Sequence, residues 1–201
     1  MTVEQIRVGR DNFSYLIYCK DTRKAALVDP GSNAHKAMGR VGHLGLKLLY
    51  IINTQHHGDH IGENPRVKKT YDCKIIASNK ENLTDYDISV QDGEILSFGN
   101  TKLKFMHTPG HTRGSMCIVE DDRYLLTGDT LFIGDCGRTD LPGGDNSQMF
   151  RSMQKIKSLP GELIVYPGHD YGTQPYDSLG NQKKVNKALL AVNQKEFDEI
   201  P

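Results

Sequence analysis

The sequence predicts one domain that combines helices and strands, of α/β or α+β class. Its 201 residues suit a single domain, and apolar residues make up 37% of them, enough for a sizeable core. Short apolar runs typical of strands alternate with segments that have the apolar spacing of helices. No internal repeat or low-complexity linker divides the chain. We therefore expect a single domain over residues 1–201.

The first half of the chain predicts two strands, a helix and a third strand. A polar turn separates the first two strands, and Asp-Pro-Gly stops the second. Asn33 is expected to cap the helix, and Gly45 to end it. The predicted strands are residues 13–19, 24–29 and 47–53, and the helix is 34–44.

The second half predicts more strands between helices. Period-two alternation marks its half-buried strands, and Met149, Met153 and Ile156 share one face of a helix. The predicted strands are residues 73–78, 93–96, 102–106, 116–120, 123–126 and 163–166, and the helices are 62–71, 147–159 and 182–193.

Composition argues against several kinds of partner. The 25 basic and 25 acidic residues cancel, so nothing indicates nucleic acid or a membrane surface. The N-terminus lacks the basic and apolar regions of a signal peptide, and the four cysteines show no metal or disulfide spacing. We expect a soluble, cytoplasmic protein; a homodimer is compatible with the sequence but not required by it.

Metal-binding side chains gather where predicted strands end. His57, Asp59 and His60 lie within four residues, directly after the strand at 47–53. His111 follows a Thr-Pro-Gly turn, and Asp129 and His169 each follow another predicted strand. Imidazole and carboxylate are the ligands of catalytic zinc sites. The six residues together predict a metal centre.

This pattern resembles the metallo-β-lactamase superfamily, whose signature is Thr-His-x-His-x-Asp-His followed by a distant His, a bridging Asp and a final His. Here the signature spans Thr54 to His60, and Gln55 stands at the position of the first His. The resemblance implies a four-layer αββα sandwich, an α+β fold.

The resemblance also implies the roles of the residues in a two-zinc site. Site one would use the Gln55 position, His57 and His111; site two would use Asp59, His60 and His169. Asp129 would bridge the two metals, and Asp59 would also act in catalysis as a proton acceptor or orienter.

Gln55 predicts that site one is weak or empty, because a neutral amide oxygen is a poorer zinc or iron ligand than imidazole. Its neighbour His56 is not expected to replace it, since adjacent side chains on an extended segment face opposite ways. The sequence does not show whether Gln55 is a natural or an introduced residue.

Two loops, residues 134–140 and 166–172, resemble the branch that holds glyoxalase II (hydroxyacylglutathione hydrolase) and the persulfide dioxygenases. In these loops Arg138 is a candidate for binding a substrate carboxylate, with a loop-anchoring salt bridge as the alternative. Tyr171 either lines the substrate pocket or packs. The chain ends soon after His169, which is expected to leave no room for the full C-terminal helical domain of glyoxalase II.

We therefore predict a metallohydrolase with reduced activity, in which metal-bound hydroxide attacks a thioester or similar small acyl substrate, including thioesters of glutathione-type thiols. The alternative is an iron-dependent glutathione persulfide dioxygenase. In that group the iron ligands would map to Gln55, His111 and Asp129, so Gln55 would disrupt the iron site directly. A third interpretation is a family member that has lost catalysis and kept a binding or structural role.

Overall fold

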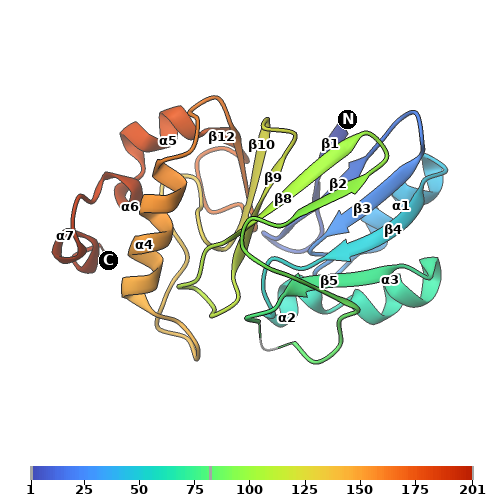
Figure 1. The fold of residues 1–201 in the computed structure, drawn as a ribbon, viewed down its shortest axis with the longest axis horizontal. Helices are drawn as coiled ribbons and strands as arrows, with labels where there is room; N and C mark the ends of the chain where they lie inside the picture. The colour runs from blue at the N-terminus through green and yellow to red at the C-terminus, as the bar shows by residue number, and fades with distance from the viewer. Residues whose placement is uncertain (1, 82, 201) are drawn as a thin grey trace.

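Two six-stranded sheets pack face to face, and helices cover both outer faces (Figure 1). The computed structural model describes residues 2–81 and 83–200. The arrangement confirms the α+β sandwich that the sequence and its family resemblance predict. No helix in the described ranges is both long enough and apolar enough to span a bilayer.

The first sheet is built from the N-terminal part of the chain. In spatial order it contains β1 (Thr2–Arg7), β2 (Phe13–Tyr18), β3 (Lys24–Val28), β4 (Lys47–Ile52), β5 (Lys74–Ser78) and β6 (Ile88–Val90). The first three strands are antiparallel, and β3 to β6 are parallel. Parallel neighbours need crossover connections. Helix α1 (His35–His43) connects β3 to β4, and α2 (Gly58–Ile61) and α3 (Asn64–Tyr71) connect β4 to β5.

The second sheet follows in the chain. Its spatial order is β12 (Asp177–Ser178), β11 (Ile164–Pro167), β10 (Tyr124–Gly128), β9 (Met116–Glu120), β8 (Thr101–His107) and β7 (Ile95–Phe98). Only β10 and β11 pair in parallel, and α4 (Asn146–Lys157) lies in the connection between them. Three short helices end the chain: α5 (Leu179–Val185), α6 (Lys187–Leu190) and α7 (Gln194–Asp198).

The two-residue period of the strands explains the layers. In β2, Tyr15 and Ile17 face the second sheet, whereas Leu16 and Tyr18 pack under α1 and α3. Both faces are covered, so every residue of β2 is buried. On the far side, Met149, Met153 and Ile156 of α4 pack against the outer face of the second sheet, as their spacing predicts.

Two predictions about helices are wrong. Helix α1 begins after Ala34, without a side-chain cap, so Asn33 is not its cap. The predicted single helix over residues 182–193 is broken at Asn186, which has extended backbone angles (φ −76°, ψ 119°). Its side chain caps α6 by accepting from Ala188 N and also donates to Phe132 O and Asp135 O. These contacts with a distant loop override the local preference for one helix.

The sequence did not predict β1, β6 or β12. β1 has a mixed polar sequence and is only partly buried at one edge of its sheet. β6 and β12 have three and two residues, too short for a period-two pattern to stand out.

We expect Asn186→Ala to lower the free energy of unfolding by about 2–4 kcal/mol, because it removes a helix cap and the two bonds that Asn186 donates to the carbonyls of Phe132 and Asp135. Urea denaturation measures the change. Asn181→Ala is the control: its side chain makes an exposed bond to Asp177, and its loss should cost less than about 1 kcal/mol. Equal losses in both variants would contradict a special role for Asn186.

Candidate metal centre

The predicted ligands meet at one end of the sandwich, where strands of both sheets finish. Residues 55–60 follow β4, Asp129 follows β10, and His169 follows β11. His111 lies in the connection between β8 and β9. A bridge between Asn12, which precedes β2, and His169 joins the two sheets at this end. The placement at strand ends agrees with the prediction from the sequence.

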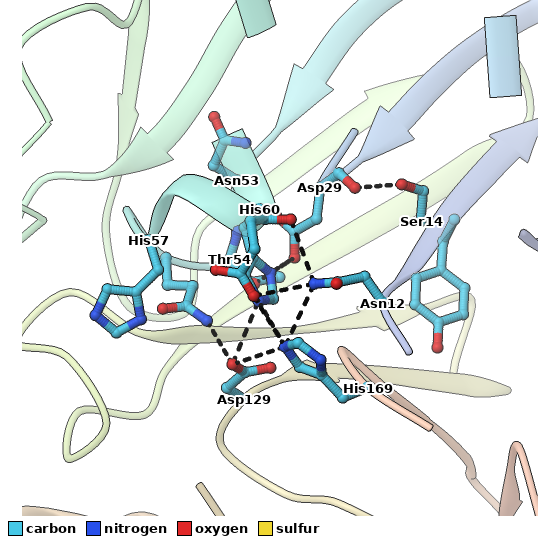
Figure 2. A network of polar contacts seen from close by, with 12 residues as sticks. Asn12, Ser14, Asp29, Asn53, Thr54, His57, His60, Asp129 and His169 are labelled. Atoms are coloured by element: carbon cyan, nitrogen blue, oxygen red, sulfur yellow. Dashed lines mark hydrogen bonds and ion pairs between the residues drawn. The ribbon is translucent and has the colours of Figure 1, made fainter. Parts of the chain in front are cut away.

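Three side chains form a compact group. The ligand atoms of Asp59, His60 and His169 all lie within 4.8 Å of one another, as a metal ion requires. His169 Nε2 is 3.3 Å from Asp59 Oδ2 and 3.4 Å from His60 Nε2. Asp129 Oδ2 lies 3.3 Å from both imidazoles (Figure 2). These are the residues that the resemblance assigns to site two and to the bridge.

Neighbouring side chains orient this group. His60 Nδ1 donates to Asp29 Oδ2 across 3.0 Å, which leaves the Nε2 lone pair facing the other ligands. Asn12 donates to Asp59 Oδ2 across 3.0 Å and lies 3.4 Å from His169 Nε2. Figure 2 shows Asn12 and Asp29 approaching from the side of β2 and β3. The sequence predicts neither residue as part of the site: Asp29 belongs to a strand-stopping turn, and Asn12 carries no motif.

The surroundings fit a cation. Asp129 Oδ1 is buried and has no hydrogen-bond partner among the described residues. A Cβ at Gly168 would lie 2.3 Å from this oxygen and 2.9 Å from His60 Cε1, so only glycine fits there. Two imidazoles and two carboxylates form a donor set typical of zinc or iron. Asp59, His60, His169 and Asp129 are the residues that would hold the metal.

The half of the centre around Gln55, which the family resemblance assigns to site one, has an amide in place of an imidazole. Gln55 is buried, and its Nε2 donates to Asp129 Oδ2 across 2.8 Å. Because Asp129 is a carboxylate, only the NH₂ edge of the amide can satisfy it, and an NH₂ group cannot coordinate a metal. Gln55 Oε1 is buried without a partner among the described residues.

His57 and His111 contact each other rather than a compact ligand group. His57 Nδ1 lies 3.0 Å from His111 Nε2, and His111 Nε2 lies 3.5 Å from Asp129 Oδ2. His111 Nδ1 donates to the Arg138 carbonyl across 2.8 Å. In Figure 2 the His57 ring stands apart from the group around Asp129. His56 forms no part of either half, since its Nδ1 bonds to Glu81 Oε1 at 2.6 Å.

Comparison with known proteins agrees with this geometry. The family model described as the metallo-beta-lactamase superfamily matches residues 7–169. The chain belongs to the metallo-β-lactamase superfamily. It is 38% identical over 177 residues to the hydroxyacylglutathione hydrolase of Pelagibacter ubique, covering 87% of this chain and 73% of that protein.

Members of a second activity class are also similar. The human mitochondrial persulfide dioxygenase ETHE1 is 33% identical over 192 residues, with 94% of this chain and 75% of that protein covered. The crystal structure of ETHE1 from Myxococcus xanthus superposes with a TM-score of 0.90 at 28% identity, covering 100% of this chain and 92% of that one. The resemblance to the glyoxalase II and persulfide dioxygenase branch is therefore confirmed.

Carboxylates around the two central imidazoles of this centre shift their pKa values upward. Burial lowers the pKa of His169, but bonds to Asp129 and Asp59 outweigh it and raise the pKa to about 9. Burial also lowers the pKa of His60, yet Asp129 and Asp29 raise it well above its usual range. The bond from His169 lowers the pKa of Asp59. The carboxylates around His60 and His169 thus favour positive charge at this position, and a divalent cation would supply it in place of protons.

The predicted substrate residues border the same centre. A cavity of about 250 Å³ is lined by His111, Asp129, Phe132, Asp135, Cys136, Arg138 and Tyr171. The Arg138 guanidinium forms two bonds of 2.6 Å to Asp140, the loop-anchoring pair considered above. The ring of Tyr171 stacks on His169 with centroids 4.8 Å apart. Arg138 and Tyr171 therefore both line the cavity, while Arg138 also pairs with Asp140 and Tyr171 also packs on His169.

We expect Asp29→Asn to weaken zinc binding about 10–100-fold, since the substitution loosens the orientation of His60. Competition with a chromophoric chelator measures the affinity. Thr54→Val is the control: it removes the Thr54 Oγ1 bond to Asp29 Oδ2 and leaves the bond to His60. Its affinity should stay within about threefold of the parent, and an equal loss in both variants would assign the effect to general destabilisation.

We expect Gln55→His to raise the metal content from one to two ions per chain, because it restores an imidazole beside His57 and His111. Elemental analysis of the purified proteins measures the content. Gln55→Ala removes the amide without supplying a ligand and should retain one ion. Unchanged content in Gln55→His would disprove our explanation of site one.

Proposed function

We propose that this protein is a metal-dependent hydrolase that cleaves thioesters of glutathione-type thiols or similar small acyl substrates. The observation that carries the proposal is the complete group of Asp59, His60 and His169 next to Asp129, in contrast to the missing imidazole at Gln55. We propose one working metal position rather than two, with activity below that of a two-metal enzyme. Zinc is the proposed metal, and iron is the alternative.

Asp59, His60, His169 and Asp129 would hold the metal, which when bound would supply a nucleophile from water at neutral pH and polarise the substrate carbonyl. The side chains prepare the site for that chemistry. Asp29 holds the His60 ring in one tautomer, and Asn12 fixes Asp59 against His169. Asp59 is ionised because its pKa is lowered, and 43% of its side chain is exposed, so it can orient or accept a proton at the cavity.

The 250 Å³ cavity provides the place for the substrate. Its wall contains His111 and Asp129, so a thioester bound there lies against the metal centre. Arg138 would hold a carboxylate of the thiol portion through its planar fork, in exchange for Asp140. Tyr171, stacked on His169, would position the same portion. The hydroxyacylglutathione hydrolase relative supports this class of substrate.

Similarity to the persulfide dioxygenases favours a second candidate, oxidation of glutathione persulfide at an iron centre. The geometry supports it less well. The three positions that would hold that iron are Gln55, His111 and Asp129, and here the Gln55 NH₂ group donates to Asp129.

We expect the metal-loaded protein to hydrolyse a hydroxyacylglutathione without oxygen uptake on glutathione persulfide. His169→Ala should lower kcat/KM at least about 100-fold through loss of a metal ligand. His43→Ala, in the last turn of α1, is the control and should leave the rate unchanged. Oxygen uptake without thioester cleavage would establish the dioxygenase. If the protein catalysed neither reaction, a non-enzymatic role would be indicated.

A further inference from the structure

A second cavity lies on the other side of the His57–His111 pair. It measures about 500 Å³ and is lined by His56, Lys80, Glu81, Arg113, Pro142 and Gly143. These residues come from four loops: those that follow β4 and β5, the β8–β9 connection, and the loop before α4. The reaction proposed above leaves this cavity without a role.

The cavity adjoins the metal centre through a row of imidazole rings in tilted and edge-to-face contact. The His56 and His57 ring centroids are 5.0 Å apart, and those of His57 and His111 are 4.7 Å apart. His111 in turn lines the 250 Å³ substrate cavity. The rings of His56, His57 and His111 therefore form a row from one cavity to the other.

The lining of the second cavity is cationic. The Lys80 and Arg113 side chains are exposed, and neither forms a salt bridge with another residue in the described ranges. Two unpaired cations at one cavity provide a place for an anion.

Glu81 is the carboxylate in this lining, but its charge is engaged inside the protein. Its side chain is only 2% exposed. It accepts from His56 Nδ1 across 2.6 Å and from Thr112 Oγ1 across 2.7 Å. It therefore anchors the wall of the cavity, and the lining carries the two exposed cations Lys80 and Arg113 against this one buried carboxylate.

The two cations are held on backbones that touch. A Cβ at Gly114 would lie 2.4 Å from the Glu81 Cα, so the loop with Arg113 packs directly on the loop with Lys80. Thr112 Oγ1 also bonds to Glu81, which joins the same two loops. Backbone contact and a buried hydrogen bond thus fix the positions from which both cations extend.

We propose that Lys80 and Arg113 bind the free carboxylate at the far end of the acyl group, so that the preferred substrates are thioesters of short dicarboxylic acids. The thiol portion occupies the cavity of Arg138 and Tyr171, and the acyl chain runs past His57 to the second cavity. Guanidinium and ammonium groups make strong, charge-assisted bonds to a carboxylate. The substrate preference rests on the proposed hydrolase function, whereas carboxylate binding does not.

The kinetic test compares two glutathione thioesters of equal carbon number, succinyl and butyryl. The parent protein should favour the succinyl thioester about 10–100-fold in kcat/KM, the range expected for charge-assisted bonds. Lys80→Met and Arg113→Met should each remove most of this preference and leave butyryl cleavage unchanged. Cleavage of both thioesters at equal rates by the parent would overturn the proposal and leave the hydrolase intact.

A binding test separates the two proposals. Succinate, butyrate and inorganic phosphate are each titrated into the isotope-labelled full chain, and the Gly143 and Gly114 amide signals are followed by NMR. Succinate should shift them with an affinity at least about tenfold above butyrate, and the Lys80→Met/Arg113→Met protein should lose the difference. If succinate binds in this way but the protein cleaves no thioester, the carboxylate-binding proposal stands and the hydrolase proposal is rejected. Phosphate binding tighter than succinate, or no succinate shift, would overturn the carboxylate assignment.

Discussion

The buried carboxylate of Asp29 connects the fold to the candidate metal centre. It stands at the end of β3 and receives bonds from Thr54 N, Thr54 Oγ1 and His60 Nδ1. Its backbone bonds to Ile52 O and accepts from Ser14 Oγ. Five bonds thus join β2, β3, β4 and α2 at one residue, which also has a left-handed φ of 46°. Such a conformation is uncommon outside glycine and persists because its surroundings fix it.

The two halves of the centre face different electrostatic conditions. Around His60 and His169, the carboxylates of Asp29, Asp59 and Asp129 raise the pKa values of both imidazoles, so their negative charge favours protons or a cation here. Around His57, burial and His111 lower the pKa of the imidazole, and a neutral amide supplies the contact to Asp129. One change of residue type, imidazole to amide, thus gives two chemically unequal positions. The protein has the metallo-β-lactamase scaffold, with imidazole and carboxylate donors gathered at Asp59, His60 and His169 and an amide at residue 55.

The residue pattern predicted most of the strands because burial on both sheet faces leaves strong apolar runs, as in β2 and β4, whereas the sandwich itself was predicted from the family resemblance. It also brought six candidate ligands and Gln55 to one place, since strand ends align ligands that are far apart in the chain. It did not predict the residues that hold them. Asn12 and Asp29 act through contacts 47 and 31 residues away, and polar residues in turns give no local signal of such contacts. The break at Asn186 has the same cause, a contact with Asp135 across 51 residues.

The contact between Asn12 and His169 spans 157 residues. All six strands of the first sheet precede residue 91, so this sheet can pair while the rest of the chain is still being synthesised. The candidate metal centre cannot form at that stage, because β11 must first pair with β10 to bring His169 into place. Closing so long a loop is entropically costly and slow. A nascent chain therefore presents Asp59 and His60 without their third partner, so a metal ion held by all three residues would mark the completed fold rather than guide its early steps.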